Sequence, residues 1–180
     1  MEVRIDGIQQ LTRALDGPAR KQVLAAADRG LKQVGMNIIA EAQTNLRRER
    51  INTTGRLSQS GRVEKDKDGY DVGFMSGEEN YASAVEFGRR AGRMPPVSDI
   101  RAWVQKKHSG AFNAARSAAA FLRKSTDAVL TSAAWAIAKS IGRHGTKPHP
   151  FFAPAVKKYE SKALEIIGSA VNQETNRINV

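Results

Sequence analysis

An unbroken apolar stripe near the N-terminus is the feature that most constrains this chain. Its members recur every three or four positions, the spacing of one buried helix face: Leu24, Ala27, Leu31, Val34, Ile38, Ala42 and Leu46. The pattern predicts a helix from about Pro18 to about Arg47, capped by Asp16. Such a helix is about 45 Å long, whereas one domain of 180 residues has a radius of gyration of about 16 Å. We therefore expect part of it to pack on something outside its own domain.

Two glycines interrupt this predicted helix. Gly30 and Gly35 would each weaken an exposed helix by up to about 1 kcal/mol. Glycine at such positions is useful where another backbone comes close. We therefore expect a neighbouring segment to approach the helix at these two residues.

A change of period after the helix predicts a β-hairpin. Between Val63 and Met75 apolar side chains alternate with polar or small ones, and Tyr70, Val72 and Phe74 share one face. Asp68-Gly69 is typical of a type I′ turn. The predicted fold class is α+β, with the long N-terminal helix and C-terminal helices packed on a small antiparallel sheet that contains this hairpin.

The second half of the chain predicts further helices. Ser98 or Asp99 is expected to cap a short helix that carries Trp103, and a longer helix is expected from about Ser117 to Ile141. Residues 142–150 contain glycines and prolines typical of a loop. Pro154 is expected to open the last helix. The segment 81–87 is compatible with a helix or a strand.

Composition and charge exclude several classes of protein. The chain has no Cys, which excludes disulfides, thiolate metal sites and a Cys nucleophile. It has no run of 18 apolar residues and no signal-peptide pattern at its N-terminus, so a cytosolically made, soluble protein is expected. The net charge is +11, and residues 91–150 contribute +8 of it. An electrostatic partner should therefore meet that segment.

No catalytic or metal-binding pattern is recognisable. Gly88-Arg89-Arg90-Ala91-Gly92 is not followed by the Lys-Ser/Thr of a phosphate-binding loop, and no Gly-x-Ser-x-Gly motif is present. His108, His144 and His149 have no neighbouring carboxylate in the sequence to complete or orient a metal site. The sequence predicts no enzyme, no metal and no cofactor.

The basic segment is the main candidate for binding. Arg89, Arg90 and Arg93 lie in a Gly-containing loop expected to be mobile, and Lys106 and Lys107 follow in the next predicted helix. Aromatic residues do not alternate with these cations as they do in a base-stacking platform. We expect a basic rim that meets an acidic partner or passing DNA without sequence specificity. Lys106 and Lys107 are the candidate nucleic-acid contacts, and a stand-alone DNA-binding protein remains an alternative.

The order of several motifs resembles that of the tail-component family of tailed bacteriophages, which includes minor-tail, tail-completion and head–tail joining proteins. The motifs are the long helix, Thr54-Gly55-Arg56-Leu57-Ser58-Gln59-Ser60, the hairpin, Tyr81-Ala82-Ser83-Ala84-Val85-Glu86-Phe87-Gly88, and Pro148-His149-Pro150-Phe151-Phe152-Ala153-Pro154-Ala155. Together they extend over about residues 5–170. Pro148-His149-Pro150 departs from the family's usual Arg-Pro before the aromatic residue.

The resemblance implies a structural virion protein of the phage neck or tail, assembled in the host cytoplasm. A tail-completion (head–tail joining) protein would form a ring, commonly a hexamer, between the head connector and the tail; a tail terminator is the alternative. Its partners would be other copies of itself, head-completion or connector proteins, and tail-tube or tail-terminator proteins, with no membrane. Residues 1–180 would form a single domain with a helical insert at about 91–142.

The resemblance also suggests an interface. Glu86, beside the basic loop of Arg89, Arg90 and Arg93, is expected to pair across a subunit contact. The neighbouring subunit would also cover the long helix. Phe151 and Phe152 would anchor a rigid loop at the interface or simply pack in the core.

Overall fold

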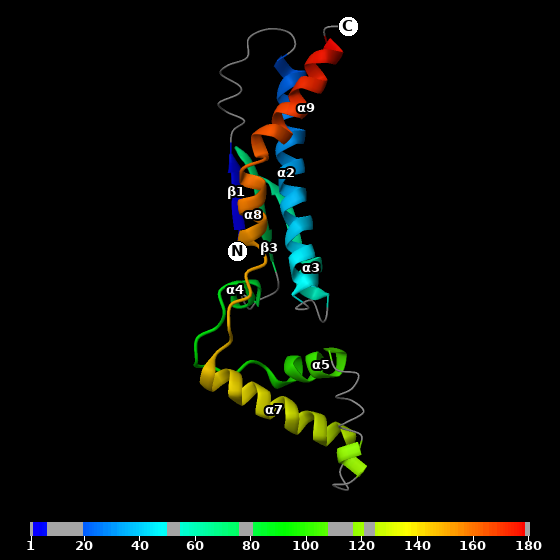
Figure 1. Ribbon diagram of the computed structural model, residues 1–180, viewed down its shortest axis with the longest axis vertical. Helices are drawn as coiled ribbons and strands as arrows, with labels where there is room; N and C mark the ends of the chain where they lie inside the picture. The colour runs from blue at the N-terminus through cyan, green and yellow to red at the C-terminus, as the bar shows by residue number, and fades with distance from the viewer. Residues whose placement is uncertain are drawn as a thin grey trace. The chain divides into compact units, whose positions relative to one another are not determined.

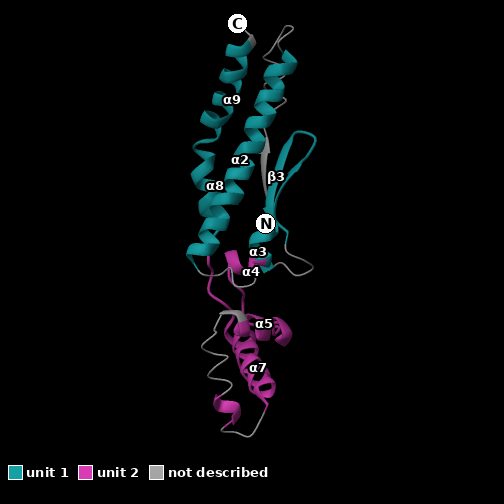
Figure 2. Cartoon of the chain, turned by 90° about the vertical axis from the view of Figure 1, so that its right-hand side faces the viewer, with its two compact units in different colours: residues 1–51, 56–82, 150–180 teal, residues 52–55, 83–149 magenta. Residues whose placement is uncertain are grey.

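The computed structural model describes residues 2–6, 20–49, 55–75, 81–107, 117–120 and 125–178. For residues 2–6, 106, 107 and 178 it describes the backbone alone. The chain divides into two compact units (Figure 2). Unit 1 comprises residues 1–51, 56–82 and 150–180, and unit 2 comprises residues 52–55 and 83–149. Unit 2 is therefore inserted, in sequence, between two parts of unit 1.

The long helix is present as α2 (Arg20–Arg48), within two residues of its predicted bounds. Its predicted apolar face is buried along most of its length, from Val23 to Leu46. The covering elements belong to unit 1: the sheet, α8 (Ala153–Glu160) and α9 (Ala163–Ile178). Figures 1 and 2 show α9 running beside the N-terminal half of α2. A second helix of the same unit thus covers α2, and packing of α2 on something outside its own domain stays a prediction.

Close approach of another backbone is confirmed at Gly30, whereas side chains approach Gly35. A Cβ on Gly30 would lie 2.9 Å from the Cα of Ile167, so the backbones of α2 and α9 nearly touch there. A Cβ on Gly35 would instead meet the methyl groups of Val63 and Val72 at 3.0 Å. Gly30 thus sets the distance between two helices, and Gly35 lets α2 lie flat on the sheet.

Three strands among the described residues form one antiparallel sheet in the order β1-β3-β2, which confirms the α+β class. β2 (Gly61–Lys65) and β3 (Gly69–Phe74) are the predicted hairpin. The turn is one residue earlier than predicted: Asp66 pairs with Gly69, so Lys67-Asp68 is at its centre and Gly69 belongs to the strand. β1 (Glu2–Asp6), which the sequence did not predict as a strand, pairs with β3.

The core of unit 1 is centred on three phenylalanines. Phe151 and Phe152 are fully buried, and their rings meet Phe74 edge to face at centroid distances of 5.1 and 5.7 Å. The side chain of Asn45, also buried, donates a hydrogen bond to the Phe151 carbonyl oxygen at 2.9 Å. This bond satisfies a buried backbone acceptor and ties the C-terminal segment to α2.

Unit 2 contains most of the remaining helices. α4 (Tyr81–Glu86) begins at its boundary, and α5 (Val97–Lys107) and α7 (Thr126–His144) pack on each other. Val104 and Leu130 form the centre of that contact, surrounded by partly buried apolar residues: Ile100, Trp103, Val129 and Ile137. The short helix α3 (Arg56–Gln59) belongs to unit 1.

Three helix boundaries differ from the predictions. α5 begins at Val97, so Ser98 and Asp99 lie in its first turn and do not cap it. The helix expected from Ser117 appears as a helical turn at 117–120 and then as α7, which starts after Ser125. The last helix is interrupted at Ser161 and Lys162, which separates α8 from α9. The expected cap Asp16 lies outside the described residues.

Candidate binding surface on unit 2

The basic loop that follows α4 is bonded to the end of α7. Arg89 and Thr146 form an isolated antiparallel bridge: the Arg89 N–H donates to the Thr146 carbonyl at 3.1 Å, and the Thr146 N–H donates back at 2.8 Å. The Gly92 N–H also donates to the Gly142 carbonyl at 2.7 Å. The sequence predicts a mobile loop, whereas these bonds hold it against the C-terminal turn of α7.

Two glycines with left-handed backbone angles make this contact possible. Gly88 has φ 74°, and a Cβ there would lie 2.6 Å from the Thr146 carbonyl oxygen. Gly145 has φ 73°, ends α7 by donating its N–H to the Ile141 carbonyl, and has no room for a Cβ beside Arg89. Any other residue at either position would be strained and would push the two segments apart.

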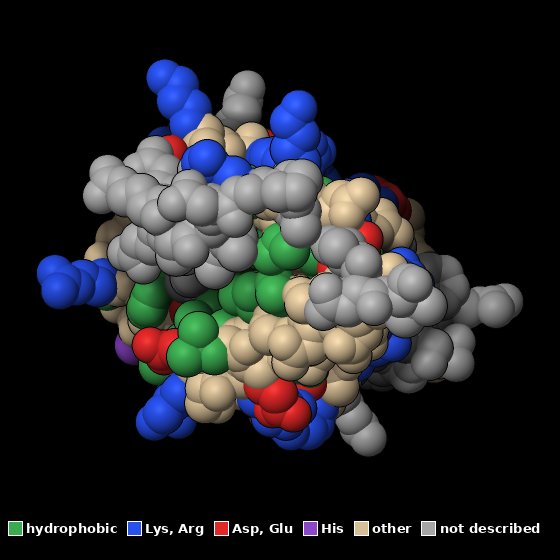
Figure 3. Space-filling model, turned by 90° about the horizontal axis from the view of Figure 1, so that it is seen from above, with side chains coloured by type: hydrophobic (Ala, Val, Ile, Leu, Met, Phe, Trp, Pro, Cys, Tyr) green, Lys and Arg blue, Asp and Glu red, His purple; other side chains and the backbone are tan. Residues whose placement is uncertain are grey.

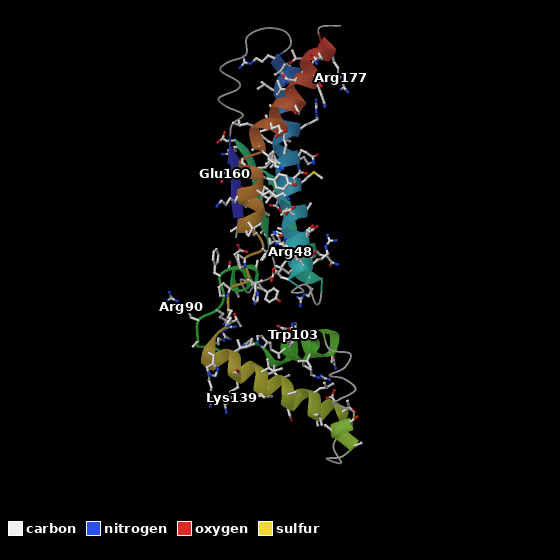
Figure 4. The ribbon with its side chains drawn as sticks, in the orientation of Figure 1. Arg48, Arg90, Trp103, Lys139, Glu160 and Arg177 are labelled. Carbon is white, nitrogen blue, oxygen red and sulfur yellow. The ribbon has the colours of Figure 1, made fainter. Side chains whose placement is uncertain are left out.

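This contact brings three backbone segments that carry cations next to one another, and we call their cations the basic junction. Its members are Arg89, Arg90 and Arg93 from the loop, Lys139 and Arg143 from α7, and Lys147 after it. All are exposed except Arg89, which is half-buried. The Arg89 guanidinium donates to the Arg93 carbonyl at 2.6 Å and so stiffens the loop. Figure 4 shows Arg90 and Lys139 projecting away from the ribbon of unit 2.

The basic junction has no acidic side chain to balance it among the described residues. None of its six cations forms an ion pair with a described Asp or Glu. The sequence explains why, since residues 87–98 and 128–149 contain no Asp or Glu. An ion pair between described residues of unit 2, Arg101 and Asp127, joins α5 to α7 instead. The cations of the junction are therefore available to a partner.

The other predicted site residues lie elsewhere. Glu86 is buried, with 2% of its surface exposed, so its carboxyl group is not at an open surface of the single chain. Phe151 and Phe152 are fully buried in unit 1, as the core-packing alternative predicts. Lys106 and Lys107 lie in the last turn of α5, and their side chains are outside the described part. Interface roles for Glu86, Phe151 and Phe152 remain predictions.

Lys139, Arg143 and Lys147 are the members of the junction that sequence reasoning missed. They lie about fifty residues after the basic loop, and nothing in their spacing points to it. One available signal was that Gly88 and Gly145 each lie within two residues of an Arg or Lys. Glycine at such positions is typical of a turn or of close approach by another backbone.

Asp28, Lys65 and Lys158 of unit 1 have pKa values that are shifted by structural contacts. Burial would raise the pKa of Asp28, but hydrogen bonds from Lys65 at 2.8 Å and Tyr70 at 2.9 Å outweigh it and lower that pKa. The hydrogen bond between Lys65 and Asp28 also raises the pKa of Lys65. This cluster fastens the hairpin to α2. Lys158 and Glu41 form a similar link between α8 and α2 at 2.8 Å, which raises the pKa of Lys158.

Neither a metal-binding cluster nor a membrane-spanning helix is found in the described part of the chain. No group of three or more described His, Cys, Asp or Glu side chains lies close enough together to hold a metal ion. None of the described helices combines the length and apolar character needed to span a membrane.

Comparison with known families finds a match to a family of bacteriophage proteins. Residues 8–88, slightly under half of the chain, match the family described as "Bacteriophage HK97-gp10, putative tail-component". The segment includes α2, the hairpin and α4, and the match confirms the resemblance to the phage tail-component family. It supports a structural role in the phage tail, with a location in the virion and contacts with other virion proteins. No curated protein and no solved structure matches the chain.

Proposed function

We propose that this protein is a tail-completion, or head–tail joining, protein that forms a ring between the head connector and the tail. The observation that carries the proposal is the match of residues 8–88 to a phage tail-component family. In this proposal the ring is a hexamer and its partners are head-completion or connector proteins on one side and tail-tube or tail-terminator proteins on the other. The role is structural and needs no catalytic group.

The surface of α9 supports self-association. Leu164 is 84% exposed, and Ile166, Ile167, Ala170 and Val171 are only half-buried against α2. Viewed from the end of unit 1 where α9 finishes, hydrophobic side chains are visible among polar ones (Figure 3). Apolar area left open on a single chain favours contact with another protein surface. In a ring, the same surface of each subunit would meet a different surface of the next one.

The helices of unit 2 support the proposed insert at about residues 91–142. α5 and α7 have their own apolar contact around Val104 and Leu130, and unit 2 lies between two parts of unit 1 in sequence. In the proposed assembly, unit 1 is the ring-forming domain. Unit 2 presents the loop of Arg89, Arg90 and Arg93, which with Glu86, Phe151 and Phe152 remains the proposed interface.

The first test is the oligomeric state of the purified protein, measured by light scattering after size exclusion and by electron microscopy. We expect a closed ring, and a monomer at all concentrations tested would contradict the proposal. Leu164→Glu should weaken the ring without lowering the melting temperature, because Leu164 makes little contact within its own chain. Met36→Glu, a similar change at a half-exposed position on α2, is the matched control and should leave the ring intact.

A second measurement separates tail completion from tail termination. Purified tails and purified DNA-filled heads from a phage that lacks the protein would each be mixed with it. A completion protein of the proposed kind should bind both and restore joining. Binding to tail tubes alone, with an effect on tube length, would identify a terminator.

A further inference from the structure

We propose that the basic junction of unit 2 binds the phosphate backbone of duplex DNA without reading its sequence. The proposal depends on unit 2 alone and not on ring formation. It concerns a surface assembled by the fold from the loop 88–93, the end of α7 and Lys147, and it differs from the predicted contacts Lys106 and Lys107.

The geometry keeps the charges together. The Arg89–Thr146 bridge and the Gly92–Gly142 bond fix the backbone of the loop beside α7. Lys139 and Arg143 are one helical turn apart, about 6 Å along the axis, and both are exposed. The segments that carry the cations are thus held together before any ligand arrives, which lowers the entropy lost on binding.

The charge balance favours a polyanion. Six cations share the surface with no described acidic partner, and each of them repels the others. The C-terminal end of α7 offsets this with a partial charge of about −0.5, which is small beside six positive charges. Duplex DNA carries about one negative charge per 1.7 Å of its axis, so each cation can reach a phosphate without a fitted pocket.

The charge of the junction favours the phosphate backbone of duplex DNA, because its members are cations that no described acidic side chain neutralises. Two exposed aromatic residues lie next to it in the chain: Phe87 precedes Gly88, and Trp135 is one helical turn before Lys139 on α7. Aromatic rings are the groups on which single strands stack, so the test below includes a single strand. Direct base reading needs an element fitted into a groove, whereas a loop and a helix end are suited to backbone contacts.

The test compares two variants with equal net charge. The junction variant replaces Arg90, Arg93, Arg143 and Lys147 with Ala. The control variant replaces four exposed cations of unit 1 with Ala: Lys21, Lys32, Lys157 and Lys162. Both lower the net charge from +11 to +7. Binding of a fluorescent duplex of about 30 base pairs is measured by anisotropy between about 50 and 200 mM salt.

We expect the junction variant to bind at least about tenfold more weakly at 50 mM salt. Its salt slope should be reduced by about 3.6, because each of the four removed cations contributes about 0.9. The control variant should stay within about twofold of the unchanged protein. A third variant replaces Arg90, Arg93 and Arg143 with Lys and keeps Lys147. It should retain most of the binding, because a phosphate contact needs the charge more than the guanidinium shape. Equal losses in both variants, or no duplex binding at low salt, would overturn the proposal.

Two further arms of the experiment test a different ligand and an interface role. A single strand of the same sequence and a poly-glutamate chain replace the duplex. If the protein binds either of them more tightly than the duplex, and the junction variant loses that binding, duplex DNA is not the ligand. The oligomeric state of the junction variant is measured in parallel. An intact ring with lost DNA binding supports the proposal, whereas a lost ring with unchanged DNA binding would assign these cations to the subunit interface.

Discussion

At the residue scale, Gly30 shows how a single missing Cβ sets the distance between two helices. Its Cα hydrogen takes the space that a methyl group would need against the Ile167 backbone. Arg29 and Glu174 also form an ion pair across the two helices at 2.7 Å. The glycine lowers the helix propensity of α2 but allows close packing along the pair.

We predict opposite effects for two Gly→Ala changes in this helix pair. Gly30→Ala should destabilise the protein by about 1–2 kcal/mol, because overpacking costs more than the gain in helix propensity. Gly168→Ala in α9, where a Cβ would meet nothing within 4 Å, should stabilise it by up to about 1 kcal/mol. Urea denaturation followed by circular dichroism measures both. If Gly30→Ala stabilised the protein, the backbones of α2 and α9 would have to lie farther apart at Gly30 than the 2.9 Å contact implies.

At the element scale, α7 has a well-defined start and end. Ser125 accepts a hydrogen bond from the Ala128 N–H at 3.1 Å, Asp127 lies in the first turn, and Gly145 terminates the helix. Arg143 and His144 in the last turn suit the negative end of the helix dipole. The helix that carries two cations of the junction is therefore fixed at both ends.

Loss of the N-cap should weaken α7 measurably. We expect Ser125→Ala to destabilise unit 2 by about 1 kcal/mol, since it leaves the Ala128 N–H without its partner. Ser132→Ala, at an exposed position in the middle of the same helix, is the control and should be neutral or slightly stabilising. Hydrogen exchange of the α7 amides reports the difference. Unchanged protection in Ser125→Ala would mean that packing on α5 alone holds the first turn.

The elements differ in how far the sequence predicted them, for physical reasons. α2 was predicted within two residues because its stripe has one period over its whole length. β1 was missed because residues 2–6 become a strand only by pairing with β3, which lies more than sixty residues later. The junction was half predicted: Arg89, Arg90 and Arg93 form a local cluster, whereas Arg143 and Lys147 join them through a bridge between distant segments.

At the scale of the whole molecule, described contacts in the core of unit 1 join segments that lie far apart in the sequence. Phe74, Phe151 and Phe152 contact one another, and Asn45 bonds to the chain where it re-enters the unit. We predict that replacing residues 83–149 with a short Gly/Ser linker leaves unit 1 folded, with a cooperative thermal transition. Loss of that transition, or of the dispersed NMR signals of the sheet, would show that unit 1 requires unit 2.

The pairing of α2 with α9 also has a consequence for biosynthesis. Arg29 and Glu174, which meet across that pair, are separated by 145 positions. At about 5–20 residues per second, a ribosome makes Glu174 roughly 7–30 s after Arg29. Throughout that interval the N-terminal half of α2 has an apolar face without its partner helix, at a time when crowded nascent chains aggregate readily. Slower translation would lengthen this exposure, so the yield of folded protein should depend on the speed of synthesis and on chaperones that shield α2.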